Sequence, residues 1–211
     1  MSWMFHTNHN FNQDISSWDV SNVTNMREMF LQASVFNQDI SSWDVSSNTN
    51  MYRMFDNADL FNSDISSWDV SNVTDFYRSF RGADAFDQDL SNWDFSSATT
   101  MNDFLNQSGL SITNYDKFLL GVSNKIDDGG SFPNNQTFAG YGLEYCSSSD
   151  FRENIINNLG WNFYGDSTNC EASIEIEVDN PLVIDVGSEF NIPEATVSDI
   201  YSDLSYETSG T

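Results

Sequence analysis

The chain has 211 residues, of which 32 are Asp or Glu and 7 are Lys or Arg, so its formal net charge is −25. This balance excludes nucleic acid as a partner, because affinity for nucleic acid rests on Lys and Arg at phosphates. It also argues against anionic membrane surfaces, and no apolar run reaches the roughly 18 residues that a membrane span needs. The composition is typical of a secreted protein that is kept soluble by its acidity.

The first half of the chain repeats with a period of 25 residues. The stretch FNQDISSWDVSNVTNMREMF begins at Phe11, and near copies begin at Phe36 and Phe61. Met1 falls inside a repeat. A fixed period in this range predicts a solenoid, in which each coil buries its apolar face on its neighbours. Two aromatic columns follow the period and are expected to form core ladders: Phe11, Phe36, Phe61 and Phe86; Trp18, Trp43, Trp68 and Trp93.

Each repeat predicts one short strand and one short helix. Residues 17–21 alternate with period two, which places Trp18 and Val20 inward and Ser17, Asp19 and Ser21 outward. An apolar stripe then recurs at helical spacing: Met26, Met29, Phe30 and Ala33. The predicted fold class is therefore an α/β solenoid of leucine-rich-repeat-like coils.

Two columns of aspartates accompany the repeat. Like charges opposite each other on a sheet are destabilising, and two interpretations of the columns stand. Water and salt screen a solvated acidic face, or Ca²⁺, which takes six to eight oxygen ligands, bridges the carboxylates. No EF-hand loop supports the calcium interpretation, so the cofactor expectation is none, with Ca²⁺ as the alternative. The candidate metal ligands are Asp14, Asp19, Asp39, Asp44, Asp64, Asp69, Asp89 and Asp94. A further column is expected to bond turn backbone: Asn12, Asn37, Asn62 and Asp87.

The repeats fade after residue 105, and the composition predicts three parts. Residues 1–108 are a solenoid of four to five coils, residues 109–170 are an α+β cap, and residues 171–211 open a β-sandwich. A cap is expected because the end coil would otherwise expose its core. Within the cap, a helical stripe runs from Tyr115 to Val122, TFAGYGLEYC and WNFYG predict strands, and SDFRENIINNLG predicts a helix. Asp150 and Glu153 have capping-box spacing, and Gly160 suits the C-terminal stop.

Cys146 and Cys170 are the only cysteines, and both fall in or just after the cap. In an acidic, secreted chain they predict a disulfide, which on the chain-entropy estimate contributes about 3 kcal/mol. The alternative is a pair of buried free thiols. A zinc or redox site is disfavoured, because there is no C-x-x-C and both histidines are distant in sequence.

The repeat resembles the BspA-type leucine-rich-repeat surface proteins, also described as the mycoplasma-lipoprotein-type 25-residue repeat. LSITNYDKFLLG, TFAGYGLEYC and FRENIINNLGWNF resemble the C-terminal segment of that family, so the likeness covers about residues 1–170. It implies a non-catalytic bacterial surface protein, usually an adhesin, and carries no residue-level binding motif. Local departures are Phe76 and Ser79 in place of a Met pair, and Asn48 in place of a core valine, which predicts one loose coil.

Residues 171–211 resemble the opening of bacterial immunoglobulin-like domains, which need about 100 residues. The chain is therefore expected to belong to a longer, multi-domain protein of the bacterial cell surface, exported by the type IX secretion system. In that context Asp166-Ser167-Thr168 matches a short O-glycosylation pattern with Ser167 as the acceptor.

Two functions remain, and neither is enzymatic, since no nucleophile–base constellation, phosphate loop or histidine cluster is present. One is an adhesion or ligand-binding module whose partner is an extracellular protein or polysaccharide. The other is a structural spacer, which is favoured by identical strand faces. Arg78 and Arg81 break the charge pattern, as a contact patch or as local counter-charges. The candidate ligand-binding residues are these two arginines with Ser17, Asp19, Ser21, Ser42, Asp44, Ser46, Ser67, Asp69, Ser71, Asn92 and Asp94.

Overall fold

The computed structural model describes residues 1–130 and 132–170. The chain divides into two compact units, residues 1–169 and residues 170–211. The predicted immunoglobulin-like segment, 171–211, lies outside the described residues. Among the described residues, no helix is long and apolar enough to cross a membrane.

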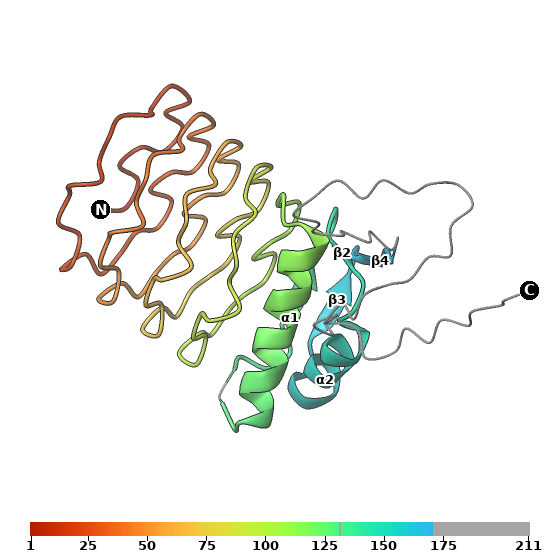
Figure 1. Cartoon of the computed structure of the whole chain (residues 1–211). Helices are drawn as coiled ribbons and strands as arrows, with labels where there is room; N and C mark the ends of the chain where they lie inside the picture. Colours follow the sequence, from red (N-terminus) through yellow and green to blue (C-terminus); the bar gives the residue numbers. More distant parts are fainter. Residues whose placement is uncertain (131, 171–211) are drawn as a thin grey trace, which may run out of the picture. The chain divides into compact units, whose positions relative to one another are not determined.

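The repeats form successive 25-residue coils that lie side by side, as the red-to-yellow part of Figure 1 shows. We number them as residues 1–25, 26–50, 51–75 and 76–100, with 101–108 as a partial last coil. Main-chain N–H groups at alternate positions donate to carbonyls of the next coil. In the second coil, Glu28 N donates to Tyr52 O at 2.9 Å and Phe30 N donates to Met54 O at 2.9 Å. Isolated parallel bridges join Asn25, Asn50, Asp75 and Thr100.

The short helix expected in each coil is not formed in the described coils, whose residues 26–33 and their equivalents are a run of turns. Two positions per coil have left-handed backbone, for example Glu28 at φ 53° and Gln32 at φ 57°. Non-glycine residues enter this region at a cost, and it ends any α-helix. Alternate N–H groups donate to the next coil, and those of Met29, Leu31 and Ala33 donate three residues back, so the bonds of an α-helix are not made. The apolar stripe is nevertheless buried: Met26, Met29, Phe30 and Ala33.

The expected strand at residues 17–21 and its equivalents is also replaced by turns. Its inward side chains are buried from the second coil on, but they bond differently from a sheet. The indole Nε1–H of Trp43 donates to Ile15 O at 3.1 Å, and Trp68 and Trp93 repeat this bond one and two coils further on. The tryptophans therefore tie neighbouring coils together as well as filling the core.

The core of the coils is a set of aromatic ladders. Phe30 stacks on Phe36 within its coil, with ring centres 4.0 Å apart, and on Phe55 of the next coil at 5.4 Å. Phe36 and Phe61 lie 6.0 Å apart. Offset stacking of this kind adds roughly 0.5–1.5 kcal/mol per pair beyond the area that it buries. The prediction that the phenylalanine columns are core ladders is confirmed.

The asparagine column acts between coils rather than inside a turn. Asn12 Oδ1 accepts from Asn37 N at 3.0 Å, and Asn37 Oδ1 accepts from Asn62 N at 2.8 Å. Asp87 N donates to Asn62 Oδ1 in the same way. The residues were expected to bond turn backbone, and the backbone N–H that each amide oxygen accepts belongs to the next coil.

A cap follows the last coil. Its first helix, α1 (Ile112–Asp127), lies beside the last coil in Figure 1. Ser111 is the N-cap, and its side chain accepts from Asn114 N. Helix α2 (Ser149–Leu159) packs on α1 and ends at Gly160, whose φ of 66° is the left-handed stop that the sequence predicts. The N-cap of α2 was expected at Asp150, and this is wrong by two positions. Ser148 is the N-cap, and Asp150 lies in the first turn of the helix.

The strands of the cap are short and parallel. Strand β1 (Thr137–Ala139) pairs with β3 (Asn162–Tyr164), and β2 (Glu144–Tyr145) pairs with β4 (Ser167–Thr168). The TFAGYGLEYC segment is therefore two strands separated by a turn, not one. Cys146 and Cys170 are disulfide-bonded, as predicted.

Candidate functional site

The aspartate columns cap their own turns. Asp19 Oδ1 accepts from Ser21 N at 3.0 Å and from Ser21 Oγ at 2.6 Å, and Asp44 and Asp69 repeat both bonds with the serines of their coils. Asp14 Oδ1 accepts from Ser16 N at 2.9 Å. An aspartate that bonds its own backbone two residues on is the usual Asx turn. The repeated carboxylates are thus required by the backbone of each coil.

These bonds lower the pKa of the capping carboxyls. The Ser hydroxyl and then the Ser N–H hold the pKa of Asp19, Asp39, Asp44 and Asp69 below the ordinary 3.8. The N–H and then the hydroxyl of the serine two residues on do the same for Asp14 and Asp64. Hydrogen bonds to the charged form favour that form. These six carboxyls therefore stay ionised at neutral pH although like charges lie one coil apart.

The structure does not gather these aspartates into a metal centre. Among the described residues, no three His, Cys, Asp or Glu side chains come together in a group that could hold a metal ion. A surface hollow of about 340 Å³ lies between two coils and is lined by Asn37, Asp39, Ser41, Asn62, Ser63 and Asp64. Its carboxylates already accept from Ser41 and Ser66.

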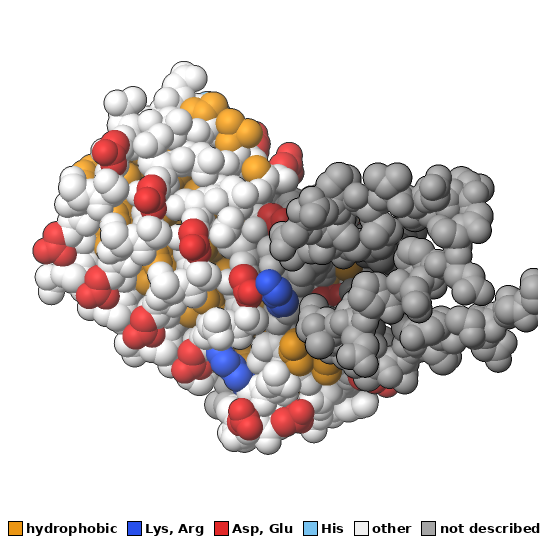
Figure 2. All heavy atoms as spheres, in the orientation of Figure 1, with side chains coloured by type: hydrophobic (Ala, Val, Ile, Leu, Met, Phe, Trp, Pro, Cys, Tyr) orange, Lys and Arg blue, Asp and Glu red, His pale blue; other side chains and the backbone are white. Residues whose placement is uncertain are grey.

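The other predicted binding residues of this face lie at the surface. Ser17, Ser42, Ser67 and Asn92 are exposed, and so is Asp94. Ser21, Ser46 and Ser71 are half-buried and donate to the aspartates of their own coils. Figure 2 shows acidic side chains at intervals across the coils, with basic side chains beside them at the side toward the cap. This face is uniform from coil to coil.

A second face carries the arginines of the coils together with three aromatic side chains outside the buried core. We call it the aromatic–arginine face and define it by Trp3, Arg27, Tyr52, Arg53, Tyr77, Arg78 and Arg81. The guanidinium carbon of Arg27 lies 4.1 Å from the ring centre of Tyr52 and 5.7 Å from that of Trp3. Tyr52 stacks on Tyr77 at 5.1 Å, and Arg78 lies 4.8 Å from the Tyr77 ring centre. A continuous row of cation–π and stacking contacts therefore crosses four coils.

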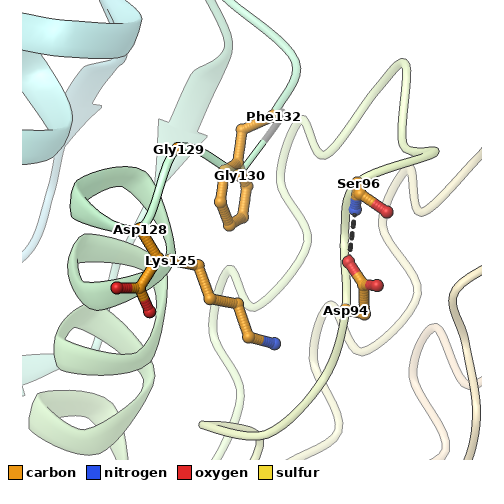
Figure 3. Close-up of a pocket in the computed structure, with 7 residues that line it drawn as sticks. All are labelled: Asp94, Ser96, Lys125, Asp128, Gly129, Gly130 and Phe132. Carbon is orange, nitrogen blue, oxygen red and sulfur yellow. Dashed lines mark hydrogen bonds between the residues drawn. The ribbon is translucent and has the colours of Figure 1, made fainter.

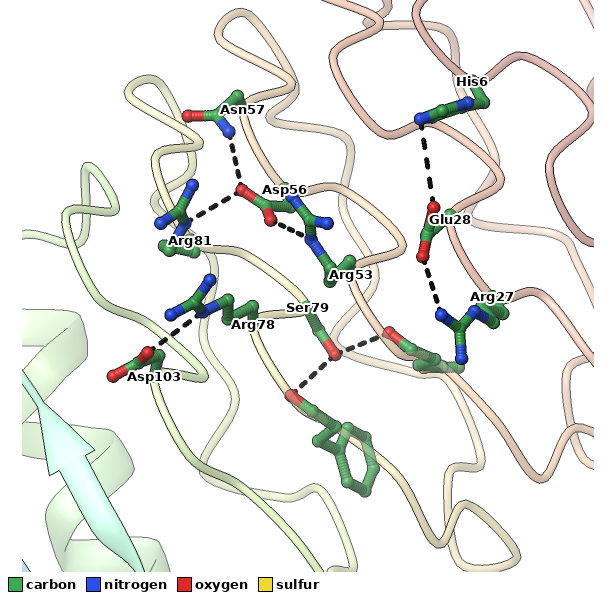
Figure 4. A network of polar contacts seen from close by, with 12 residues as sticks. His6, Arg27, Glu28, Arg53, Asp56, Asn57, Arg78, Ser79, Arg81 and Asp103 are labelled. Atoms are coloured by element: carbon green, nitrogen blue, oxygen red, sulfur yellow. Dashed lines mark hydrogen bonds and ion pairs between the residues drawn. The ribbon is translucent and has the colours of Figure 1, made fainter.

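Carboxylates hold the arginines of this face, as Figure 4 shows. Asp56 is fully buried and binds Arg53, Arg81 at 3.1 Å and Asn57 Nδ2 at 2.7 Å. Arg78 Nε lies 3.0 Å from Asp103 Oδ2. Arg53, Arg78 and Arg81 all use Nε, so their Nη groups have no hydrogen-bond partner among the described residues. The guanidinium groups are fixed while most of their donors remain free.

The second buried acid of this face is Glu28. Its carboxylate lies 3.1 Å from Arg27 Nη2 and 3.9 Å from His6 Nε2. Sequence reasoning found Arg78 and Arg81 but missed Arg27, Arg53 and the two buried acids. The sequence did hold a signal for this face, because the two residues after the Met26 column vary between coils. They are Arg-Glu at 27–28, Tyr-Arg at 52–53 and 77–78, and Asn-Asp at 102–103, whereas the DISSWDVS half of the repeat hardly changes.

Every basic side chain of the protein is engaged. The sequence holds seven Lys and Arg, and each contacts a carboxylate or a main-chain carbonyl among the described residues. Arg78 and Arg81 are thus counter-charges to carboxylates, whether or not they also bind a partner. The other cations are Lys117 with Asp89, Arg152 with Asp166, and Lys125 with carbonyls of the fourth coil.

A hollow of about 350 Å³ lies where α1 meets the fourth coil, and Figure 3 shows its lining. Lys125 Nζ donates to Asn92 O at 3.1 Å and to Trp93 O. Asp94 Oδ1 accepts from Ser96 N at 2.9 Å. Burial lowers the Lys125 pKa and nearby Asp94 raises it, with the net shift downward. Because the Lys125 amine donates to main-chain carbonyls of the fourth coil, it holds α1 on the coils.

The cap holds a buried polar network of its own. Arg152 binds both carboxylate oxygens of Asp166 at 2.9 and 3.0 Å, and the Tyr115 hydroxyl donates to Asp166 at 3.0 Å. Burial, followed by the charge of Asp166, raises the pKa of Tyr115 well above 10.0. The predicted glycosylation acceptor, Ser167, follows this aspartate and is exposed on β4.

Comparison with known families adds one result. The family model described as "Mycoplasma protein of unknown function, DUF285" matches residues 1–118, which is more than half of the 211 residues. No curated protein and no solved structure matches the chain. The matched range covers the described coils and the start of α1, and it agrees with the resemblance to the mycoplasma-type 25-residue repeat. The chain therefore belongs to the family described as a Mycoplasma protein of unknown function, DUF285.

Proposed function

We propose that the protein is a non-catalytic binding module of the bacterial cell surface and that the aromatic–arginine face carries recognition. The observation behind this is the contrast between two faces of the same coils. The aspartate face is identical from coil to coil, and its carboxylates are used by their own turns. The aromatic–arginine face varies along the stack, with Tyr-Arg shared by the third and fourth coils alone, and forms one continuous row.

The chemistry of this face suits an extracellular protein better than a polysaccharide. Tyr, Trp and Arg dominate binding hot spots between proteins. The ring faces of Tyr52 and Tyr77 are covered by each other and by arginines, which leaves their edges and hydroxyls for a partner. The free Nη donors of Arg53, Arg78 and Arg81 fit carboxylates or carbonyls, which a guanidinium binds with its fork of donors.

The same proposal includes the architecture and the location. We treat residues 1–108 as a repeat solenoid and residues 109–170 as its cap. The disulfide between Cys146 and Cys170 suits an oxidising, extracellular setting, as do the net charge and the family resemblance. Export by the type IX system, glycan attachment at Ser167 and calcium binding stay predictions.

Adhesion of beads that display the full chain tests the proposal. The beads are offered a panel of immobilised matrix proteins and polysaccharides, and the bound variants are compared. Tyr52→Ser with Tyr77→Ser should abolish retention on a protein surface that wild type binds. The matched control is Asp19→Asn with Asp44→Asn, which keeps the turn acceptors and should bind normally. Loss in the control and not in the tyrosine variant would place recognition on the aspartate face instead.

A structural spacer is the second candidate, and one observation favours it. The turn-capping role of the aspartates accounts for the repeated face without any ligand. A spacer predicts that wild-type beads bind nothing in the panel. It also predicts that the double tyrosine variant has no phenotype when it replaces wild type in the full-length surface protein.

A further inference from the structure

Two arginines of the aromatic–arginine face share a single carboxylate. Asp56 Oδ2 accepts from Arg53 Nε, and Asp56 Oδ1 accepts from Arg81 Nε at 3.1 Å. Asp56 is fully buried, whereas both arginines are only half-buried. Figure 4 shows the acid between the two guanidinium groups. We call Arg53, Asp56 and Arg81 the shared-acid cluster.

The charges of the shared-acid cluster do not balance. Each of the other three arginines has an acid that no second arginine contacts: Arg27 with Glu28, Arg78 with Asp103, and Arg152 with Asp166. Glu28 acts on Arg53 only from beyond ion-pair distance. Two guanidinium groups against one carboxylate leave the cluster with one positive charge in excess, although the chain as a whole has a net charge of −25.

The donors that remain on the cluster fit one further carboxylate. A guanidinium carries five N–H donors, and Asp56 takes only the Nε–H of each arginine. The Nη groups of Arg53 and Arg81 have no hydrogen-bond partner among the described residues. A carboxylate from outside would accept two parallel bonds from such a fork, and its charge would neutralise the excess.

The aromatic–arginine face continues from the coils onto the cap. Arg78 Nε lies 3.0 Å from Asp103 Oδ2, and the Tyr164 hydroxyl lies 3.5 Å from Asp103 Oδ1. Tyr164 contacts Tyr141 edge to face, with ring centres 5.5 Å apart. These two tyrosines are the exposed large hydrophobic side chains of the described cap. The Tyr141 ring lies against Gly165, where an added Cβ would come within 2.6 Å of it, so the backbone holds the ring in place.

An acidic peptide segment suits both parts of this surface. The four arginine side chains of the face are 27–39% exposed, whereas its three acids are 0–14% exposed, so positive charge faces outward here. Tyrosine and arginine are typical of binding hot spots between proteins. A long polyanionic polysaccharide fits less well, because the acidic remainder of the chain repels it beyond the face.

We propose that Arg53 and Arg81 bind a carboxylate of an acidic peptide segment of the partner, and that Tyr141 and Tyr164 contact its apolar side chains. The inference rests on the function proposed above. It names the chemistry of the partner that the aromatic–arginine face recognises, and it adds two residues of the cap to that face.

Titration of the full chain with a blocked peptide tests this inference. The probe is acetyl-Asp-Tyr-Pro-Asp-Tyr-Pro-amide, and its matched control has Asn in place of both Asp. The side-chain N–H resonances of Arg53 and Arg81 report binding. The acidic probe should shift both sets of resonances saturably. The Asn peptide should bind at least about tenfold more weakly, because a charge-assisted hydrogen bond is lost.

Variants of the chain locate the binding. Arg81→Gln leaves Asp56 paired with Arg53, removes the excess charge and should weaken probe binding at least about tenfold. Lys117→Gln makes the same charge change at an exposed pair with Asp89 and should leave the affinity within about twofold. Tyr141→Ser should weaken binding about fivefold or more. If Arg81→Gln does not fold, Arg81→Lys takes its place, since it keeps the charge and loses the fork.

Absence of any guanidinium shift at millimolar probe, or equal binding by wild type and the Arg81 variant, would overturn the inference. Dextran sulfate is titrated in parallel. Saturable shifts with dextran sulfate and none with the peptide would assign the cluster to a polyanionic polysaccharide, which also overturns it. Bead retention that depends on Tyr52 and Tyr77 but not on Arg81 would overturn this inference alone. Bead retention that survives the double tyrosine variant would instead contradict the proposed function.

Discussion

Single residues that depart from the repeat are explained by their local packing and hydrogen bonds, and the explanation differs from site to site. Phe76 and Ser79 replace a Met pair, and the exchange is compensated: Phe76 fills the core against Phe95 and Phe104. Ser79 is fully buried and donates through Oγ to main-chain carbonyls, of Met51 at 2.8 Å and Phe76 at 3.0 Å. A larger and a smaller side chain thus share the space, and the hydroxyl is satisfied.

Asn48, which replaces a core valine of the repeat, leaves one buried polar group without a hydrogen bond. It is buried where Val73 is buried in the next coil, and its Nδ2 has no hydrogen-bond partner. Asn48→Val should raise the free energy of unfolding by about 1–2 kcal/mol, because a buried unsatisfied amide is removed. Urea denaturation measures this, with the exposed Asn22→Val as control. A less stable Asn48 variant would show that the amide is satisfied and useful.

Asp56 fixes the geometry of the aromatic–arginine face. Asp56→Asn removes the charge that holds Arg53 and Arg81 and should lower the free energy of unfolding by about 1–3 kcal/mol. The exposed Asp84→Asn should change it by less than about 0.5 kcal/mol. Denaturant titration of both variants checks the difference. Equal effects would mean that net charge, and not the local ion pairs, governs stability.

At the scale of elements, Asp87 joins the coils to the cap. It stands where Asn12, Asn37 and Asn62 serve the earlier coils, and it accepts from Ser111 N at 2.9 Å, Ser111 Oγ at 2.8 Å and Asn114 Nδ2 at 2.8 Å. All three donors bond to one oxygen, Asp87 Oδ1, at the start of α1, where a negative charge is favoured. The exchange of Asn for Asp marks the boundary of the cap.

Removing that carboxylate should loosen the start of α1. Asp87→Ala is expected to lower the free energy of unfolding by about 1–2 kcal/mol, as for the loss of a helix cap. Asp87→Asn keeps an acceptor and should cost clearly less. Hydrogen exchange at Ser111 and Asn114 provides a local readout. If the Ala and Asn variants are equally stable, the contact does not hold the junction.

The helices predicted in the cap are formed, whereas the helices predicted in the coils are not, and both outcomes have one reason. The stripe from Tyr115 to Val122 lies in a 16-residue helix that bonds internally. The stripe from Met26 to Ala33 has the same spacing, but alternate N–H groups in it bond to the next coil. Side-chain spacing reports which residues are buried, and both backbones bury the same ones. The partner of each N–H is decided by the neighbouring coil.

At the scale of the whole molecule, the aspartate turns make stability depend on pH. Six of these carboxyls have a folded pKa below the ordinary 3.8 because of hydrogen bonds from the serine two residues on. Their stabilisation is complete above the unfolded pKa and is lost as pH falls through the lower folded pKa. The thermal midpoint should therefore fall between about pH 5 and about pH 2.

Asp59 acts in the opposite direction, since burial and then Asp84 raise its pKa, but it is one group against six. Replacing Asp19, Asp44 and Asp69 together by Asn keeps acceptors for the serines and should reduce the acid-induced fall in the midpoint. A variant that loses stability in acid as steeply as wild type would show that other carboxyls govern the transition.

The sequence by itself determined the 25-residue period, the buried columns, the two helices that follow the coils and the disulfide. Each of these depends on residue type and spacing along the chain. Only the tertiary structure decided the backbone conformation of the coils, the role of the aspartates as turn caps and the place of the arginines. Glu28 and Asp56 are buried acids that charge patterning assigns to the surface. Asp56 pairs with Arg53 of its own coil and with Arg81 of the next, whereas Glu28 pairs with Arg27 of its own coil. The contact between Asp56 and Arg81 exists only once the coils have stacked.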